Sequence, residues 1–248
     1  MESYVSFAQV YDLFMDNVPY LKWSEYLLKL LDEQGVQEGI VVDLACGTGK
    51  ITRELAKAGY DMIGIDQSED MLRIAQEKEK DSSILYLLQD MRSFELYGTV
   101  RAVLTICDSL NYLLKKEEWE AVAKLVKLYL DPGGVWIFDF HTPDYYEALS
   151  GEVLAEQREE GSFIWENIYE KESKLHQAEL TFFLPIKKEQ NLYQKTTEIH
   201  SQRAMYLEEV QEILVKAGLI FLEAYSGFEE KKAQGKEERI LVICKKEE

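Results

Sequence analysis

The sequence predicts an α/β protein: a doubly wound, mostly parallel sheet with a small antiparallel β insertion. Between residues 40 and 140, short and almost wholly apolar runs alternate with amphipathic helical stretches, as expected for strands buried on both faces. After about residue 151 apolar and polar residues alternate instead, which is typical of antiparallel strands with one exposed face. With 248 residues, 46% of them hydrophobic, the chain is long enough for one large core.

Two helical stretches open the chain. The first is indicated by apolar residues at helical spacing, namely Phe7, Val10, Tyr11 and Phe14. The second begins at Pro19 and is closed by Gly35. We assign residues 1–35 to N-terminal helices.

The α/β pattern occupies residues 36–150 and resumes over 204–248. Its first five strands are predicted from apolar runs, namely 40–45, 61–66, 84–88, 100–107 and 135–140. The helices between them have clear boundary signals, namely Gly59 as a stop, Ser68 as an N-cap, and a helix from Trp119 to Leu130 that ends at the turn Asp131-Pro132-Gly133-Gly134. A last helix over about 207–217 ends at Gly218, and two strands follow near 219–225 and 239–245.

Residues 151–203 are predicted to form the antiparallel insertion. One strand is indicated by alternating apolar residues from Ala178 to Ile186, and neighbouring strands by residues 163–170 and 192–200. Pro185 favours an edge position, because proline cannot donate to a strand ladder. We expect His176 to be solvated and place Ile199 and Ser201 toward the core, so that His200 and Arg203 point either to a cleft or outward.

Charge and cysteine usage exclude several classes of protein. The chain has 28 basic and 46 acidic side chains and therefore a net charge of −18. This charge disfavours nucleic acid and anionic lipid as partners. Three separated cysteines without a Cys-x-x-Cys motif predict neither a disulfide framework nor a zinc site. No apolar run is long enough to span a membrane. We therefore expect a cytoplasmic protein with no metal site.

The most informative segment is VVDLACGTG, residues 41–49, between the first strand and the following helix. Open α/β sheets bind ligands at this carboxyl edge. A Walker loop is excluded, because Leu44 and Ile51 replace its required glycine and hydroxyl residue. A dinucleotide fingerprint is disfavoured by Thr52 at its third glycine position. Asp43 would repel a pyrophosphate but attract a ligand that carries an ammonium group.

This segment resembles the first motif of the class I S-adenosylmethionine-dependent methyltransferases, in particular their small bacterial members. Further matches follow in order: the acid Asp66 after the second strand, the pair Asp90-Met91 after the third, and Cys107-Asp108 after the fourth. The resemblance implies a seven-stranded Rossmann-like sheet and a set of residues that bind S-adenosyl-L-methionine: Tyr11, Trp23, Asp43, Ala45, Cys46, Gly47, Thr48, Gly49, Asp66, Gln67, Met71, Asp90, Met91, Cys107 and Asp108. It also implies that the N-terminal helices of residues 1–35 lie over the cofactor site.

Structural alternatives exist for these residues. Asp43 and Asp66 could cap the turns that follow them, and Tyr11 and Trp23 lie on apolar helical stripes, where aromatic residues are often core. Cys46 is interpreted as a small packing residue. His141, after the fifth strand, could act as a general base, but the structural interpretation, packing before the helix start at Thr142-Pro143, is favoured.

The resemblance implies methyl transfer to an N, O or C nucleophile, and the acidic chain favours a small-molecule acceptor. The insertion would form a lid over that acceptor. The alternatives are a non-catalytic module that binds S-adenosylmethionine, or a methyltransferase acting on RNA or protein; an NAD-dependent oxidoreductase is disfavoured by Asp43 and Thr52. No catalytic side chain is assigned, and the protein is expected to be a monomer or a homodimer.

Overall fold

The computed structural model describes residues 18–79, 83–187 and 192–247. Its main sheet has seven strands in the order β10-β11-β5-β4-β1-β2-β3. Their bounds are β1 (Ile40–Leu44), β2 (Asp61–Asp66), β3 (Leu85–Leu88), β4 (Val100–Thr105), β5 (Leu130–His141), β10 (Leu219–Ser226) and β11 (Arg239–Lys246). Only β11 runs antiparallel to its neighbours in this sheet, so the predicted doubly wound, mostly parallel, seven-stranded fold is confirmed.

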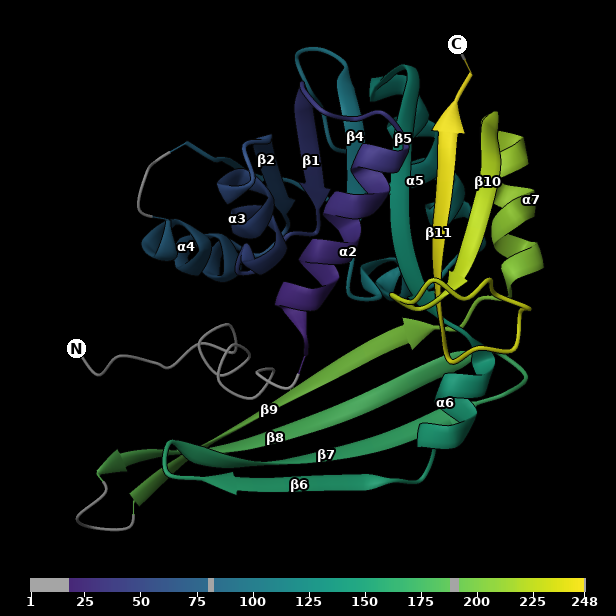
Figure 1. Ribbon diagram of the computed structural model, residues 1–248. Helices are drawn as coiled ribbons and strands as arrows, with labels where there is room; N and C mark the ends of the chain where they lie inside the picture. The colour runs from purple at the N-terminus through teal and green to yellow at the C-terminus, as the bar shows by residue number, and fades with distance from the viewer. Residues whose placement is uncertain (1–17, 80–82, 188–191, 248) are drawn as a thin grey trace.

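Helices cover both faces of this sheet (Figure 1). One face carries α2 (Tyr20–Glu33), α3 (Lys50–Lys57) and α4 (Glu69–Lys78), and the other carries α5 (Lys116–Tyr129) and α7 (Leu207–Ala217). Neighbouring residues of β1 therefore enter different cores: Val41 packs in the cluster that includes helix α2, and Val42 in the cluster that includes α5. This double burial is the reason why β1 is almost wholly apolar.

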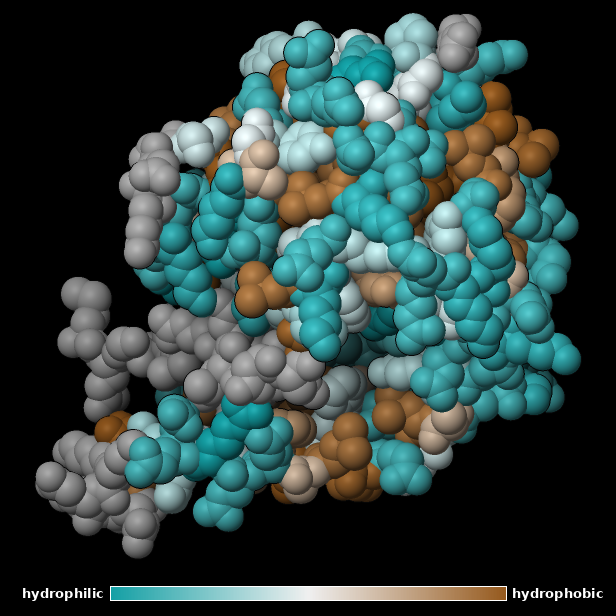
Figure 2. All heavy atoms as spheres, viewed as in Figure 1, coloured by the Kyte–Doolittle hydropathy of each residue, from teal (hydrophilic) through white to brown (hydrophobic). Residues whose placement is uncertain are grey.

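The insertion is a separate four-stranded antiparallel sheet in the order β6-β7-β8-β9. The short helix α6 (Pro143–Leu149) leads into it, and its strands are β6 (Val153–Arg158), β7 (Gly161–Glu170), β8 (Leu175–Lys187) and β9 (Leu192–Arg203). Figure 1 shows it below the main sheet, at the carboxyl ends of the parallel strands. Its outer side keeps apolar residues in solvent, including Ile168 and Ile199, and Figure 2 shows apolar side chains along this lower part of the molecule.

Three expectations about the insertion are wrong. Pro185 lies on β8, which is an interior strand of this sheet. The pairing of β8 with β7 ends at Phe183, so β7 needs no hydrogen bond from residue 185, and the missing N–H of proline is tolerated there. Ile199 and Ser201 are exposed, because the even-numbered residues of β9 face inward. His176 is only 2% exposed, since it lies in phase with buried Ala178 on β8.

The segment after α5 also differs from the prediction. Leu130 already belongs to β5, and the register between β4 and β5 shifts so that Val100 pairs with Leu130 and Ala102 with Val135. Residues 131–134 therefore form an irregularity within β5 rather than a turn before it. A side chain at Gly134 would come within 2.9 Å of the Asp131 carbonyl oxygen, which explains the glycine there. No helix within the described ranges is long and apolar enough to cross a membrane.

Candidate functional site

The Gly-rich loop joins β1 to α3 at the carboxyl edge of the sheet. Ala45, Gly47 and Gly49 have positive φ angles of 66°, 54° and 71°. A Cβ added to Gly49 would lie 2.6 Å from the Tyr86 hydroxyl and 3.2 Å from the Ala75 Cβ, whereas one added to Gly47 would meet no atom of the residues that the structure describes within 4 Å. The loop is thus packed against protein at Gly49 and open at Gly47, where a ligand can approach the backbone closely.

Asp66, at the end of β2, is tied to this loop. Its Oδ2 accepts a hydrogen bond from the Gly47 amide at 2.8 Å, and its Oδ1 accepts one from the Ser68 amide at 2.8 Å. Desolvation raises the pKa of Asp66, although these amides oppose the shift. The cap of α4 is Ser68, whose hydroxyl accepts from the Met71 amide, so Asp66 is not needed as an N-cap. Each carboxylate oxygen keeps a second lone pair for a hydroxyl group.

Asp43 lies beneath the loop rather than in its mouth. The residue is 3% exposed, and its Oδ2 accepts a hydrogen bond of 2.5 Å from the hydroxyl of Thr52, which is wholly buried in α3. Burial raises the pKa of Asp43 to about 6. This position runs against the direct attraction between Asp43 and an ammonium group that the charge pattern suggested. Thr52 fills the place of the third glycine and holds the first turn of α3 to β1.

The residues expected around adenine follow β2 and β3. Gln67 is exposed, and Met71 and Met91 are half-buried, with Met91 packed against the main core. The Asp90 Oδ1 accepts a hydrogen bond of 2.8 Å from the Arg92 amide, and the Arg92 guanidinium lowers the pKa of Asp90. Asp90 is therefore an ionised acceptor on the edge of the site, which leaves its assignment to adenine a prediction.

The residues between Ala45 and Gly49 mainly contact other protein groups. Thr48 is 3% exposed, and its carbonyl oxygen accepts a hydrogen bond of 2.6 Å from Arg53. Cys46 is half-buried, and burial raises the pKa of its thiol well above the ordinary value, as it does for Cys107. Nearby carboxylates add to this rise, and the arginines Arg53 and Arg239 beside the two thiols do not reverse it, so neither thiol is an activated nucleophile. Both are consistent with packing residues at the wall of the site.

A network of charged groups lies at the ends of β4 and β5. Cys107 and Asp108 both have positive φ angles, 64° and 50°, so the backbone turns sharply there. Asp108 pairs with Arg239 from β11 at 2.9 Å and accepts a hydrogen bond of 2.8 Å from the Gln202 amide of β9. The neighbouring cations and donors lower the pKa of Asp108 despite desolvation. Asp108 is thereby held ionised.

Arg239 also pairs with Asp139, which is wholly buried on β5. The Nη2 of Arg239 lies 2.7 Å from the Nε2 of His141, and the Nδ1 of His141 lies 3.0 Å from the Glu238 carbonyl oxygen. Because a carbonyl oxygen only accepts, Nδ1 carries the proton and Nε2 accepts from Arg239. Burial lowers the pKa of His141 to about 4. Both ring nitrogens of His141 are engaged, which supports the structural interpretation over a general base.

Trp23 on α2 lies beside the same network. Its ring stacks on Phe228 with centroids 4.1 Å apart, and the guanidinium of Arg239 lies 5.1 Å from its centroid. Phe228 and Arg239 thus hold this ring, and its contact with a cofactor stays a prediction. Tyr11, the other aromatic residue predicted at the cofactor, lies outside the described residues.

Sequence reasoning missed Arg239, Asp139 and Gln202. Asp139 had a detectable signal, since it is a charged residue within the otherwise apolar run 135–140. Arg239 directly precedes a buried strand, but nothing local distinguishes it from a surface arginine. Gln202 could be found only once β9 was known to turn its even-numbered residues inward. Among the described residues, no group of three or more His, Cys, Asp or Glu side chains could hold a metal ion.

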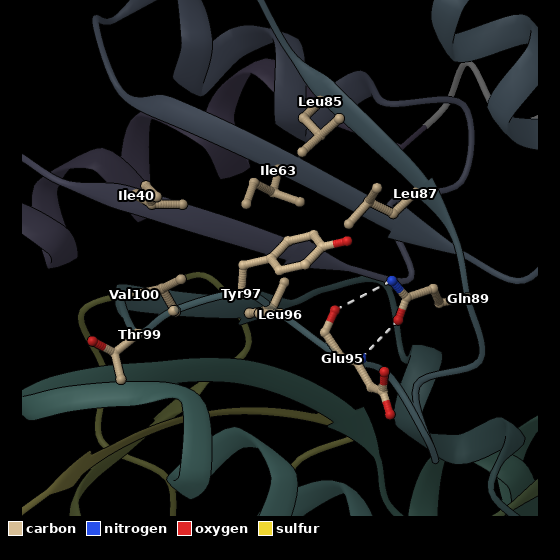
Figure 3. Close-up of a pocket in the computed structure, with 11 residues that line it drawn as sticks. Ile40, Ile63, Leu85, Leu87, Gln89, Glu95, Leu96, Tyr97, Thr99 and Val100 are labelled. Atoms are coloured by element: carbon tan, nitrogen blue, oxygen red, sulfur yellow. Dashed lines mark hydrogen bonds between the residues drawn. The ribbon is translucent and has the colours of Figure 1, made fainter.

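A separate apolar cavity of about 260 Å³ lies elsewhere on the main sheet (Figure 3). Its walls include Ile40 of β1, Ile63 of β2, Leu85 of β3 and Leu96 and Tyr97 of the segment before β4. The β3–β4 connection contains no helix that would cover these strands, which accounts for the cavity. It contains none of the loop residues described above, so the cavity is not the predicted cofactor site.

Comparison with known proteins gives consistent matches. A family model described as a methyltransferase domain matches residues 41–134. A putative methyltransferase of Bacillus subtilis is 34% identical, over 98% of this chain and 97% of its own length. A dTDP-3-amino-3,4,6-trideoxy-alpha-D-glucopyranose N,N-dimethyltransferase of Streptomyces venezuelae is 31% identical, over 54% of this chain and 57% of its own length.

Solved structures share the whole architecture. An S-adenosylmethionine-dependent methyltransferase from Clostridium acetobutylicum superposes with a TM-score of 0.86. The two sequences are 27% identical, and the superposition covers 98% of each chain. The likeness therefore includes the insertion as well as the main sheet.

Proposed function

Because this chain belongs to the class I S-adenosylmethionine-dependent methyltransferase superfamily, we propose that it transfers the methyl group of S-adenosylmethionine to a nucleophilic atom of a small molecule. The observation that carries this proposal is the link between Asp66 and the Gly47 amide. That link joins an acid at the end of β2 to Gly47, where an added Cβ would meet no atom of the described residues within 4 Å. The site thus offers hydroxyl acceptors beside an open backbone, as a nucleoside ligand requires.

The residues that would hold the cofactor follow from these positions. Asp66 would accept hydrogen bonds from the ribose hydroxyls, and Gln67, Met71, Asp90 and Met91 would surround the adenine. The backbone of residues 45–49, with Cys107 and Asp108 across the edge, would border the amino-acid end. Asp43 would act indirectly, by holding the first turn of α3 through Thr52. The bound cofactor supplies an electrophilic methyl group, so the protein's task is to position the acceptor and exclude water.

The insertion would form the acceptor side of the site. Its inner face combines aromatic residues of β7, such as Trp165, with inward-facing polar residues of β9, such as Glu198 and His200. This mixture suits a polar small molecule better than a long acidic polymer, which the net charge of −18 would repel. The amino-sugar dimethyltransferase among the relatives supports nitrogen as the accepting atom.

Isothermal titration calorimetry with S-adenosylmethionine and S-adenosylhomocysteine tests cofactor binding. Asp66→Ala should abolish measurable binding, whereas the matched control Asp61→Ala, at the exposed start of the same strand, should bind as the wild type does. Transfer is tested with methyl-labelled cofactor and a protein-free, low-mass filtrate of a Bacillus subtilis extract. Absence of binding by the intact protein would overturn the proposal. Binding without labelled product would favour a non-catalytic binding module.

A further inference from the structure

Three side chains outside the predicted cofactor set lie in a row at the proposed acceptor side, and we call them the Tyr112 relay. The Tyr112 hydroxyl lies 3.3 Å from Nδ1 of His200, and Nε2 of His200 lies 3.4 Å from a carboxylate oxygen of Glu198. Tyr112 belongs to the 3-10 helix η1 (Ser109–Tyr112) after β4, whereas His200 and Glu198 lie on β9. The Tyr112 relay thus bridges the two parts of the molecule that meet at the carboxyl edge.

The protein fixes the position of Tyr112 through its neighbour Asn111. The wholly buried Asn111 side chain donates to the carbonyl oxygens of His141 and Arg203, at 3.0 Å and 2.7 Å, and accepts from the His141 amide at 2.9 Å. These bonds tie η1 both to β5 and to the end of β9. A buried amide with its partners satisfied is costly to displace, so the spacing between Tyr112 and β9 is held by the fold.

Proton positions follow from the contacts of His200. Its Nδ1 accepts from the Tyr112 hydroxyl at 3.3 Å when the ring proton is on Nε2. The Glu198 carboxylate, 3.4 Å from Nε2, makes no hydrogen bond to it in this geometry but can form an ion pair once the ring is protonated. Tyr112 is 46% exposed, whereas the side chains of His200 and Glu198 are 20% and 32% exposed. The tyrosine is therefore the accessible end of the Tyr112 relay, and the histidine and glutamate lie behind it.

We propose that Tyr112 receives the proton that the acceptor loses on methylation and passes its own hydroxyl proton to His200, with Glu198 stabilising the resulting imidazolium. This inference rests on the proposed function. The acceptor nitrogen forms a bond to the methyl carbon, the carbon–sulfur bond breaks, and its electron pair stays on sulfur. The N–H proton then moves to the Tyr112 oxygen as the tyrosine proton moves to Nδ1 of His200. The three side chains together gain one proton and release it to solvent afterwards.

The surroundings of these side chains set their resting protonation states. Desolvation lowers the pKa of His200, so the ring is neutral at pH 7 and able to accept a proton. Desolvation also raises the pKa of Tyr112, and the charges of Asp108 and Glu198 raise it further. Tyr112 thus stays a protonated phenol that relays a proton rather than a standing phenolate. Tyr112 and Glu198 are titratable groups that lie against His200.

Tyr112→Phe, His200→Gln and Glu198→Gln test the proposal, with Tyr97→Phe as the matched control on the exposed segment before β4. Cofactor affinity by calorimetry should be unchanged in all four. Labelled methyl transfer to the low-mass filtrate should fall about 100-fold in Tyr112→Phe and remain at the wild-type rate in Tyr97→Phe. The wild-type rate should rise with pH through the His200 pKa, and His200→Gln should lose that limb.

Nuclear magnetic resonance of histidine-labelled protein gives a readout that needs no turnover. The His200 pKa in the complex with S-adenosylhomocysteine should fall in Glu198→Gln, because the stabilising carboxylate is lost. Wild-type transfer rates in Tyr112→Phe, or a His200 pKa that Glu198→Gln leaves in place, would overturn the proposal. Failure of the wild type to bind cofactor or transfer methyl groups would instead overturn the proposed function, and the relay with it.

Discussion

Asp43→Asn tests how the buried carboxylate beneath the Gly-rich loop affects folding. The residue is 3% exposed, and burial raises its pKa from 3.8 to about 6. A carboxyl group that holds its proton more tightly in the folded chain destabilises that state as pH rises through these two values. With these pKa values, linkage gives a loss of about 1.4 kcal/mol of unfolding free energy between pH 5 and pH 8.

Asparagine keeps the shape of the side chain and can still accept a hydrogen bond from Thr52, but it has no proton to lose. The unfolding free energy of the variant relative to the wild type should therefore increase by about 1.4 kcal/mol from pH 5 to pH 8. Urea unfolding followed by tryptophan fluorescence measures both proteins at several pH values. Asp61→Asn, at an exposed site, is the control. Parallel pH profiles for Asp43→Asn and the wild type would refute the reasoning.

Three further predictions concern the same edge of the sheet. Arg239→Met should lower the unfolding free energy by about 3–5 kcal/mol, because it leaves the buried Asp139 without its cation, and urea unfolding measures this loss. Gly49→Ala should lower the melting temperature and weaken cofactor binding in calorimetry, because φ is +71° and the new methyl group would collide with the Tyr86 hydroxyl. Iodoacetamide at pH 8 should label Cys107 far more slowly in the folded protein than in urea, because burial raises the pKa of its thiol; equal rates would contradict this.

The main sheet could be predicted because its strands are buried on both faces. Val41 and Val42 enter different cores, so both must be apolar, and the run from residue 40 is readable from the sequence alone. Glycine stops were equally reliable where the backbone needs a left-handed residue: Gly218 ends α7 with a φ of 75°. Such signals are local, and they survive without knowledge of the tertiary structure.

The faces of the insertion strands could not be predicted as well. Apolar Ile199 was expected to face the core and His200 either a cleft or the outside; in the structure Ile199 is exposed and His200 is half-buried, because the even-numbered residues of β9 face inward. The burial of His176 was also misjudged. It lies two residues before the buried Ala178 on β8, and this position determines its burial more than the polarity of its side chain does. The inward polar residues of β9 find polar partners, Gln202 on Asp108 and His200 beside Tyr112, so the usual apolar pattern reverses there.

The candidate site was predictable to the extent that it follows strand ends. Asp66 and Asp108 do lie at one edge of the sheet, each bonded to a neighbouring loop or strand. The charge pattern around Asp43 was the weakest inference, because the sequence does not tell whether an acid after a strand points to the mouth of a site or beneath it. Arg239 could not be paired with Asp108, since 131 positions separate the two residues and only the sheet order brings them together.

Gln202 couples the insertion to the cofactor edge of the sheet. Its amide donates to Asp108 at 2.8 Å and its oxygen accepts from the Tyr146 hydroxyl at 3.2 Å, while the residue is only 8% exposed. Moving β9 away would leave a buried amide and an ionised carboxylate without partners, and each such loss costs about 1–3 kcal/mol. If the insertion acts as the proposed lid, opening it while Asp108 stays in place would carry this cost. A movement of β9 that keeps the bond between Gln202 and Asp108 shifts the loop after β4 as well, which would couple the proposed acceptor side to the predicted cofactor residue Asp108.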